Sequence, residues 1–371
     1  MDAFVKAQVA GGAKTLPGRW YCDAAVFAAE AERIFGRDWI CVARAEQLPA
    51  PGSFVAAEIA GESIIVVRGA DERLRAFYNV CRHRGTQLCA ERAGRFAGSI
   101  SCPYHAWTYG LDGSLLAART MGDVDDFDRG DYPLHQAALA ELHGFVFVSL
   151  AAQPEPLARS HAAIAERFGS WRLGELRTAR TIEYEVACNW KLVFQNYSEC
   201  YHCPLLHPQL DRLSPSDSGR NDLTEGPFLG GYSELRERRG SLTTSGETSR
   251  PPIRDLAVAD RERVYYYTLF PSLLLSLHPD YAMAHVVRPI APDRTAIACS
   301  WLFEPETIAA AGFDPSDAVE FWDLTNRQDW RVSESTQRGV ASRAYVPGPY
   351  ANGEGLLAAF DRHYLSLMRD V

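Results

Sequence analysis

The spacing of apolar residues changes near residue 37 and divides the first half of the chain into two parts. Residues 24–36 carry apolar side chains at helical intervals and end at Gly36, which predicts a helix. From Trp39 onward, short runs rich in β-branched and aromatic residues alternate with turns, and strand patterns continue to residue 150. We therefore expect an N-terminal helical segment over residues 1–36 and a small antiparallel β domain over residues 37–155.

The second half, residues 156–371, mixes strand and helix patterns and is expected to form a second domain. Residues 213–256 are polar, rich in Gly, Ser and Pro, and show no period, which predicts a functional or disordered loop. A long helix is predicted over about 316–342, with Ser316 as its N-cap. Strands are predicted at residues 181–188, 264–270, 272–278, 281–290 and 295–305.

Composition and charge narrow the class of protein. The chain has 371 residues, of which 47% are hydrophobic and 23% charged, so it is long enough for two globular domains. A formal net charge of −9 argues against nucleic-acid binding. We expect no membrane span and no secretion signal, and therefore a cytoplasmic protein. Two of the nine cysteines belong to the Cys/His pairs described below, and the others are better explained as free buried thiols in a reducing compartment than as a disulfide framework.

Two short Cys/His pairs lie in the first domain, each on a predicted turn. Cys81 and His83 form the first pair, Cys102 and His105 the second, and eighteen residues separate His83 from Cys102. Zinc sites usually pair Cys with Cys and His with His at such spacings, whereas here each pair offers one of each. Two thiolates on one iron and two imidazoles on the other fit an asymmetric [2Fe-2S] cluster. A closed zinc site and chance occurrence are the alternatives.

Residues beside these pairs have predicted supporting roles. Gly85 would let the backbone approach a cluster, and Trp107 and Tyr109 could cover it and donate a hydrogen bond. Cys89 lies between the pairs without a partner at ligand spacing, and we interpret it as a buried free thiol.

A second constellation lies in residues 189–208, which predict a helix over 189–203 capped by Asn189 and ended by Pro204. His202 on this helix and His207 just after it could converge on one metal. Two His and one carboxylate form the facial triad of non-haem Fe(II) oxygenases, and Asp323 or Asp329 of the last helix could complete it. Satisfied core histidines are the alternative.

The side chains of this predicted helix separate into two stripes. Its polar stripe consists of Gln195, Glu199 and His202. Because no thioredoxin-like pattern surrounds Cys200 and Cys203, a redox dithiol is not favoured. The apolar stripe, which predicts a buried face, consists of Trp190, Val193, Phe194, Tyr197 and Tyr201.

The two constellations together resemble the terminal oxygenase α subunit of the Rieske non-haem iron oxygenases, in the expected order along the chain. The resemblance implies an α+β protein. An N-terminal antiparallel β Rieske [2Fe-2S] domain would occupy residues 37–155, and a helix-grip catalytic domain residues 156–371. Residues 1–36 would pack on the catalytic domain.

The resemblance also implies roles for individual residues. Glu199 matches the acidic residue that bridges the iron site to a Rieske histidine of the neighbouring subunit, which implies a homotrimer. His202, His207 and Asp329 match the mononuclear iron ligands, with Asp323 as the second choice for the carboxylate. The cluster ligands would be Cys81, His83, Cys102 and His105.

Glu at position 199, followed by His-Pro at 207–208, resembles the branch that acts on betaine-like and carnitine-like quaternary amines. The implied activity is hydroxylation or N-demethylation of a small amine, using dioxygen and electrons from NAD(P)H through a flavin-containing reductase or a ferredoxin. At least one of the tyrosines at 265–267 should face inward from its predicted strand, where an aromatic wall could hold a quaternary ammonium, and Arg288 or His285 could hold a carboxylate. An aromatic-ring hydroxylating dioxygenase or aryl O-demethylase, and a non-catalytic zinc-stabilised ligand-binding protein, remain as alternatives.

Overall fold

The computed structural model describes residues 4–236, 240–369 and 371, and the chain divides into two units. Residues 31–162 form one unit, and the N-terminal segment through Glu30 joins Ala163–Val371 in the other. The division falls within the predicted first helix, which consists of an α-helical part, α2 (Ala24–Glu30), and a π-helical turn, Ala31–Phe35. Both units are described separately below.

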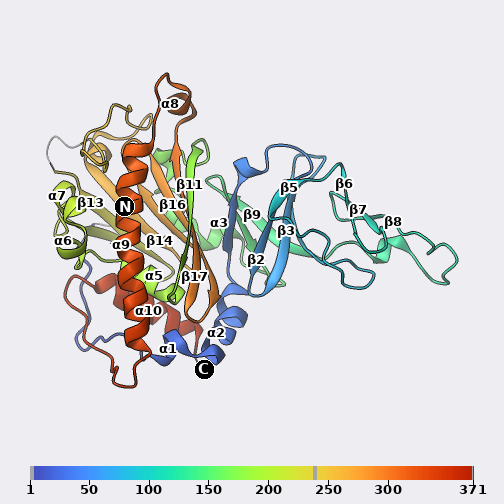
Figure 1. Ribbon diagram of the computed structural model, residues 1–371, viewed down its shortest axis with the longest axis horizontal. Coiled ribbons are helices and arrows are strands. Elements are labelled where there is room, and N and C mark those ends of the chain that lie inside the picture. The colour runs from blue at the N-terminus through green and yellow to red at the C-terminus, as the bar shows by residue number, and fades with distance from the viewer. Residues whose placement is uncertain (1–3, 237–239, 370) are drawn as a thin grey trace. The chain divides into compact units, whose positions relative to one another are not determined.

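The smaller unit is built on antiparallel strands, as the alternating pattern predicts. A seven-stranded sheet has the order β1-β10-β9-β4-β3-β2-β5, and β6, β7 and β8 form a separate three-stranded sheet (Figure 1). Helix α3 (Leu157–Ser160) follows the last strand. The strands are β1 (Ile40–Arg44), β2 (Ser53–Ile59), β3 (Glu62–Arg68), β4 (Leu74–Tyr78), β5 (Ala93–Arg95), β6 (Ser99–Ser101), β7 (Thr108–Gly110), β8 (Leu115–Ala117), β9 (Gln136–Leu142) and β10 (Phe145–Ser149).

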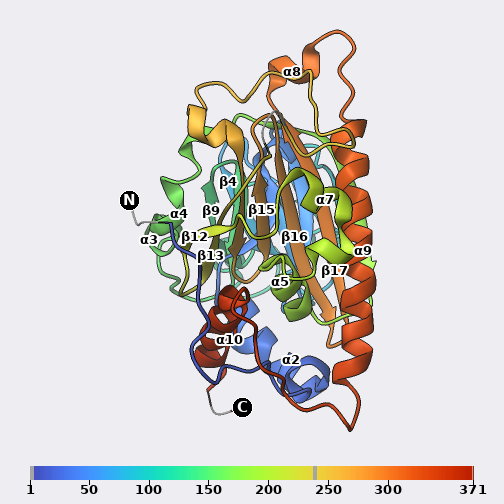
Figure 2. The ribbon, with the colours of Figure 1, turned by 90° about the vertical axis from the view of Figure 1, so that its left-hand side faces the viewer.

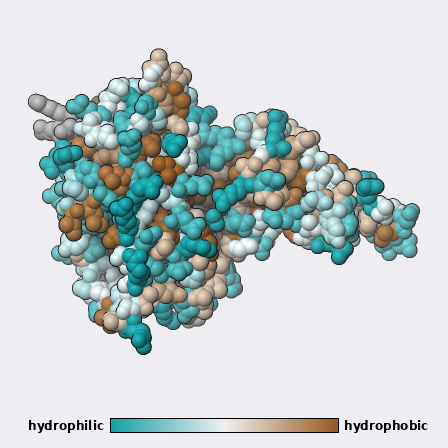
Figure 3. All heavy atoms as spheres, in the orientation of Figure 1, coloured by the Kyte–Doolittle hydropathy of each residue, from teal (hydrophilic) through white to brown (hydrophobic). Residues whose placement is uncertain are grey.

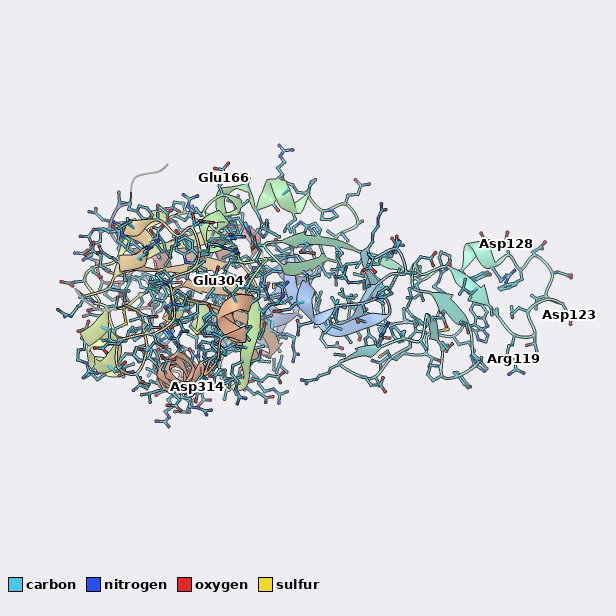
Figure 4. The ribbon with its side chains drawn as sticks, turned by 90° about the horizontal axis from the view of Figure 1, so that it is seen from above. Arg119, Asp123, Asp128, Glu166, Glu304 and Asp314 are labelled. Carbon is cyan, nitrogen blue, oxygen red and sulfur yellow. A yellow bond between two sulfur atoms is a disulfide. The ribbon has the colours of Figure 1, made fainter. Side chains whose placement is uncertain are left out.

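One hydrophobic core joins the sheets of the smaller unit to its Cys/His turns. Phe77 of β4 and Ile100 of β6 are fully buried in the same cluster as Cys81 and Cys102. The turns are therefore attached to a rigid support. The loop after β8, by contrast, is polar, and Figure 4 shows Asp123 at its far end, with Arg119 and Asp128 nearer the strands.

The larger unit contains a second antiparallel sheet of seven strands, in the order β11-β17-β16-β15-β14-β13-β12. The predicted hairpin at 291–294 is present, because Ala291 of β16 pairs with Arg294 of β17. With this sheet and the helices beside it, the chain is an α+β protein. The strands are β11 (Arg177–Val186), β12 (Arg220–Leu223), β13 (Phe228–Glu234), β14 (Arg263–Leu269), β15 (Leu273–Leu277), β16 (Ala282–Ala291) and β17 (Arg294–Phe303).

Strands β12 and β13 lie within residues 213–256, where the sequence predicts only an irregular loop. The prediction is wrong there because Gly230 and Gly231 weaken the strand pattern. Their lack of side chains is what permits the pairing. A Cβ at Gly230 would lie 2.1 Å from the carbonyl oxygen of Tyr266, and one at Gly231 would lie 1.9 Å from that of Arg220.

Helix α9 (Ser316–Val340) runs along the sheet of the larger unit beside β17, as Figure 2 shows. The predicted helix is confirmed, but its N-cap is Pro315, and Ser316 is its first residue. Helix α10 (Gly355–Leu367) was not predicted, because its residues 356–360 are apolar and buried on all sides. The other helices are α1 (Arg19–Cys22), α4 (Ala162–Ala165), α5 (Trp190–Tyr197), α6 (Cys203–Leu206), α7 (Pro208–Leu213) and α8 (Pro305–Ala309).

No helix among the described residues is both long and apolar enough to cross a membrane. On the face seen in Figure 3, hydrophobic residues form small groups among hydrophilic ones.

A buried ion pair fixes the N-terminal segment to α5. The Lys191 ammonium group contacts the Glu30 carboxylate, and the exposed fractions of the two side chains are 0% and 1%. Glu30 also accepts hydrogen bonds from Trp190 Nε1 at 2.9 Å and from the Tyr364 hydroxyl at 2.6 Å. Burial lowers the pKa of Lys191, and Glu30 opposes that effect. The carboxylate thus joins residues of α2, α5 and α10.

We expect Lys191→Met to lower the free energy of unfolding by about 3–5 kcal/mol, because it leaves the Glu30 charge buried without its cation. Urea unfolding followed by circular dichroism measures the change. The matched control is the double variant Glu30→Gln, Lys191→Met, which should cost less than the sum of the two single variants. Additive effects of the single variants would show that the two groups do not interact.

Candidate active site

The two Cys/His turns of the smaller unit share one backbone arrangement. In the first, Gly85 N donates to Cys81 O at 3.0 Å and Cys81 N donates to Thr86 O at 2.8 Å. In the second, Ala106 N donates to Cys102 O at 3.1 Å and Cys102 N donates to Trp107 O at 2.8 Å. Gly85 (φ 74°) and Ala106 (φ 57°) both adopt the left-handed conformation that closes each turn.

The four predicted cluster ligands separate into a buried and an outer pair. Cys81 and Cys102 are 3% and 4% exposed. Burial raises the pKa of the Cys81 thiol, and the neighbouring Cys102 adds a smaller increase. The rings of His83 and His105 lie 4.8 Å apart between centroids, and His83 is exposed. Two adjacent buried sulfurs beneath two outer imidazoles fit a [2Fe-2S] cluster with Cys₂ and His₂ ligation.

Neighbouring residues support this geometry as the sequence predicts. The Tyr109 hydroxyl lies 3.3 Å from Cys81 Sγ and accepts a hydrogen bond from Arg82 N at 3.0 Å. Trp107 stacks on His83, with ring centroids 4.8 Å apart and planes inclined by 7°. Cys89 is a buried free thiol, as expected. A hydroxyl donor beside a cluster sulfur and a ring beside a ligating imidazole are positioned to tune a reduction potential.

His202, His207 and Asp329 converge in the larger unit. Their potential ligand atoms lie within 4.8 Å of one another, and this is the one such group of three or more among the described residues. Asp329 Oδ1 lies 2.7 Å from His207 Nε2 and 3.4 Å from His202 Nε2. Three donors on one side of a cavity form the facial arrangement that leaves positions open for other ligands.

Hydrogen bonds from the second nitrogen of each imidazole orient both rings. His202 Nδ1 lies 2.5 Å from Glu199 Oε1, and His207 Nδ1 lies 2.7 Å from Gln328 Oε1. Because each Nδ1 is held by an oxygen, each Nε2 is directed toward Asp329. Gln328 was not identified from the sequence, although its position next to Asp329 on α9 was a usable signal.

Hydrogen bonds within the triad shift the pKa values of its members. Burial raises the pKa of Asp329, but hydrogen bonds from His202 and His207 outweigh it and hold the pKa below its ordinary value. Burial lowers the pKa of His202, whereas its hydrogen bonds to Asp329 and Glu199 outweigh burial and raise that pKa to about 10. An ionised carboxylate between two oriented imidazoles fits a divalent iron ion.

The other carboxylate considered for the triad, Asp323, lies elsewhere. Its side chain accepts a hydrogen bond from the Tyr184 hydroxyl at 2.7 Å and pairs with Arg327 at 2.9 Å. The structure therefore brings Asp329, and not Asp323, to the two histidines.

The segment that carries His202 is less helical than the sequence predicts. Helix α5 ends at Tyr197, where Ser198 Oγ donates to Phe194 O at 2.6 Å and competes with continuation of the helix. Glu199 and His202 consequently lie on a turn, and Tyr201, predicted to be buried, is 72% exposed.

A disulfide between Cys200 and Cys203 closes this turn. The expectation of free thiols is therefore wrong for these two residues, whose Cα atoms are 4.9 Å apart and within bonding range. It is correct for the five other cysteines outside the Cys/His pairs. Gln195, predicted to belong to the same polar stripe, is buried and contacts Tyr21 and Asp361 instead.

A cavity of about 460 Å³ lies beside the triad and is lined by His202, His207 and Asp329. Tyr197, Tyr266 and Trp322 also line it. The Tyr266 ring lies 6.1 Å from Tyr197 and 6.3 Å from Trp322 between centroids.

The three consecutive tyrosines of β14 divide between the two faces of the strand. Tyr265 donates to Asp260 and Tyr267 to Asp222, so both face away from the cavity that Tyr266 lines. The expectation that one of them faces inward is confirmed.

Two family models match this chain. The Rieske [2Fe-2S] domain matches residues 38–128, and the ring hydroxylating alpha subunit (catalytic domain) matches residues 173–370, more than half of the chain. The chain belongs to the Rieske oxygenases of the ring-hydroxylating alpha-subunit family. This Rieske oxygenase is thus an oxidoreductase of the [2Fe-2S] and mononuclear-iron type, and the zinc-stabilised, non-catalytic alternative is wrong.

Curated relatives cover most of the length of this Rieske oxygenase. The glycine betaine monooxygenase oxygenase subunit of Chromohalobacter salexigens is 32% identical over 92% of this chain and 82% of its own. The carnitine monooxygenase oxygenase subunit of Escherichia coli (strain K12) is also 32% identical, over 89% and 85% of the two chains.

Solved structures show the same fold. The quaternary ammonium Rieske monooxygenase CntA matches with a TM-score of 0.81 and 28% identity, over 95% of this chain and 94% of its own. Naphthalene 1,2-dioxygenase from Rhodococcus sp. matches with a TM-score of 0.79 at 20% identity, over 95% and 94% of the chains, which is a likeness of fold alone.

Proposed function

We propose that this Rieske oxygenase is a monooxygenase that hydroxylates or N-demethylates a small betaine-like quaternary amine. The observation that carries the proposal is the aromatic group of Tyr197, Tyr266 and Trp322 in the cavity that also contains the triad. Aromatic faces attract quaternary ammonium groups through cation–π interactions, so these rings would hold the cation beside the iron ligands. The glycine betaine and carnitine monooxygenase relatives support this substrate class.

Each site residue has a proposed role. Cys81, His83, Cys102 and His105 would hold the cluster, and His202, His207 and Asp329 the iron. When bound, these groups supply electron storage and dioxygen activation, respectively. Glu199 and Gln328 keep the imidazoles oriented through their Nδ1 atoms. The aromatic rings position the C–H bond to be oxidised and exclude water from it.

The amine product follows from the position of the new hydroxyl group. Oxygen inserted into a C–H bond next to the cationic nitrogen gives a hemiaminal. Collapse of the hemiaminal breaks the C–N bond, releases a proton and yields a tertiary amine and a carbonyl compound. The carbonyl compound is formaldehyde when the oxidised carbon is an N-methyl group.

We further propose that the active form is a homotrimer in which a Rieske imidazole of one subunit docks near Glu199 of the next. Two observations support this arrangement: His83 is exposed at the surface of its unit, and Glu199 lines the cavity and contacts His202. The electrons would reach the cluster from NAD(P)H through a separate flavin-containing reductase or ferredoxin.

Product analysis tests the substrate class. The enzyme, reconstituted with iron, sulfide and a reductase, is incubated with a panel of betaine-type and carnitine-type amines and with arenes. We expect a tertiary amine and a carbonyl product from at least one quaternary amine, and no cis-diol from any arene. Turnover of arenes alone would reject the proposal and favour a ring hydroxylase.

Tyr266→Leu is expected to raise KM for the quaternary amine about two- to thirtyfold, the range that a cation–π contact of 0.5–2 kcal/mol implies. Steady-state kinetics on the amine found in the panel measures the change. Tyr266→Phe is the matched control, because it keeps the ring and should retain a KM close to the wild-type value. An unchanged KM in Tyr266→Leu would show that the ring does not contact the cation.

A further inference from the structure

The N-terminal segment forms part of the wall of the substrate cavity. Val5 N donates to Asn221 O at 2.7 Å, and Asn221 N donates to Val5 O at 2.6 Å, so the segment pairs with the edge strand β12. Ala7 N donates to Asn221 Oδ1 at 3.3 Å. The backbone is therefore held on both sides of Lys6. Both Lys6 and Asn221 line the cavity.

Neighbouring side chains support this position of the segment. The Phe4 ring packs edge-on against Tyr232 of β13, with centroids 4.8 Å apart. Ala7 is buried against the start of α10, where a Cβ at Gly355 would lie 2.7 Å from the Ala7 carbonyl carbon.

Lys6 is the one lysine or arginine among the described residues that line the cavity. The residues that the sequence suggested for a carboxylate do not line it: His285 is 1% exposed and lies 3.3 Å from Asn326 Oδ1, and Arg288 lies outside the lining. Lys6 is exposed and forms no ion pair with any residue that the structure describes. Its charge is consequently available to a ligand.

The cavity thus combines two kinds of recognition. Tyr197, Tyr266 and Trp322 offer aromatic faces, and the exposed Lys6 offers a positive charge. Since Lys6 is exposed whereas His207 is 1% exposed, the lysine lies toward the open side of the cavity. A molecule with a quaternary ammonium at one end and an anion at the other matches this pattern.

We propose that Lys6 binds the carboxylate of a zwitterionic quaternary amine and so selects betaine-type substrates over amino alcohols of the choline type. The proposal rests on the proposed function. A carboxylate pairs with the ammonium group, whereas a hydroxyl in its place gains little from the charge. Because Lys6 is accessible to solvent, the contribution is moderate and is screened by salt.

The experiment compares two substrates that share a trimethylammonium group, one ending in a carboxylate and one in a hydroxyl. KM, kcat and inhibition constants are measured for wild type, Lys6→Gln, Lys6→Arg and Lys14→Gln. Lys14 is the matched control because it is an exposed lysine of the same segment, bridged to Pro349 and outside the cavity lining.

We expect Lys6→Gln to raise KM or the inhibition constant of the carboxylate compound roughly two- to fivefold at low salt, with kcat unchanged. Lys6→Arg should restore the wild-type KM or inhibition constant of the carboxylate compound. The KM and inhibition constant of the hydroxyl compound should be the same in all variants. An equal change for both compounds would show that Lys6 only supports the segment. The proposal would be overturned by such an equal change, by no change in Lys6→Gln, or by a preference of the wild type for the hydroxyl compound.

The wild-type arm separates this proposal from the proposed function. If the wild type neither binds nor converts any quaternary amine, the proposed function fails and the role of Lys6 fails with it. If the wild type converts such amines but Lys6→Gln does not discriminate between the two compounds, only the role of Lys6 is overturned.

Discussion

Asp329→Ala is expected to remove the mononuclear iron and to lower turnover by more than about 100-fold, while the [2Fe-2S] cluster remains. Loss of a hydrogen bond to a ligand costs about 10- to 100-fold in metal affinity or activity, and loss of the ligand itself should cost more. Asp329 lies between the Nε2 atoms of both histidines, so no other described carboxylate in this group can replace it. Iron and sulfide content per chain and product formation provide the measurements.

Asp323→Ala is the matched control for this variant. It lies on the same helix but binds Tyr184 and Arg327, so we expect iron content and turnover near the wild-type values. Iron loss in Asp323→Ala together with iron retention in Asp329→Ala would contradict the assignment.

Glu199→Gln is expected to keep the cluster and the iron but to lower turnover about 10- to 100-fold. The amide oxygen can still accept the hydrogen bond from His202 Nδ1, whereas the negative charge that the proposed trimer places between His202 and the next subunit is lost. Reduced protein is mixed rapidly with dioxygen and substrate. The visible absorbance of the cluster then gives the rate at which the cluster is reoxidised. We expect this rate to fall while KM changes little.

Glu354→Gln provides the comparison for Glu199. Burial raises the pKa of the Glu354 carboxyl, and the nearby charge of Glu199 adds to this effect. The Glu354 carboxylate accepts a hydrogen bond from Ala351 N rather than from a histidine. Normal reoxidation in Glu354→Gln and slow reoxidation in Glu199→Gln would assign the effect to the charge next to His202. Equal rates in wild type and Glu199→Gln would exclude that role.

The sequence predicts well those features that depend on neighbours in the chain. The β domain follows from local alternation, and the two Cys/His turns follow from spacing, because each turn is closed by hydrogen bonds within six residues. The strands at 264–305 are also predicted from their local sequence pattern, and they pair in one continuous sheet.

Features that depend on distant contacts are not predictable in this way. Asp323 and Asp329 lie on one helix, and only the docking of that helix against His207 shows which of them faces the metal site. The end of α5 at Tyr197 and the pairing of the Gly230–Gly231 strand depend on contacts that periodicity does not reveal. The position of Lys6 in the cavity wall depends on pairing with Asn221, more than 200 residues away.

A single-turnover experiment tests the central claim most directly. Protein reconstituted with iron and sulfide is reduced without oxygen, freed of reductant, and mixed with dioxygen in the presence or absence of a betaine-type amine. We predict a brown protein whose cluster is reoxidised rapidly only with the amine, with formation of a tertiary amine and a carbonyl product. A colourless protein that holds zinc but no sulfide, or a reducible cluster that yields no product from any quaternary amine, would contradict the account.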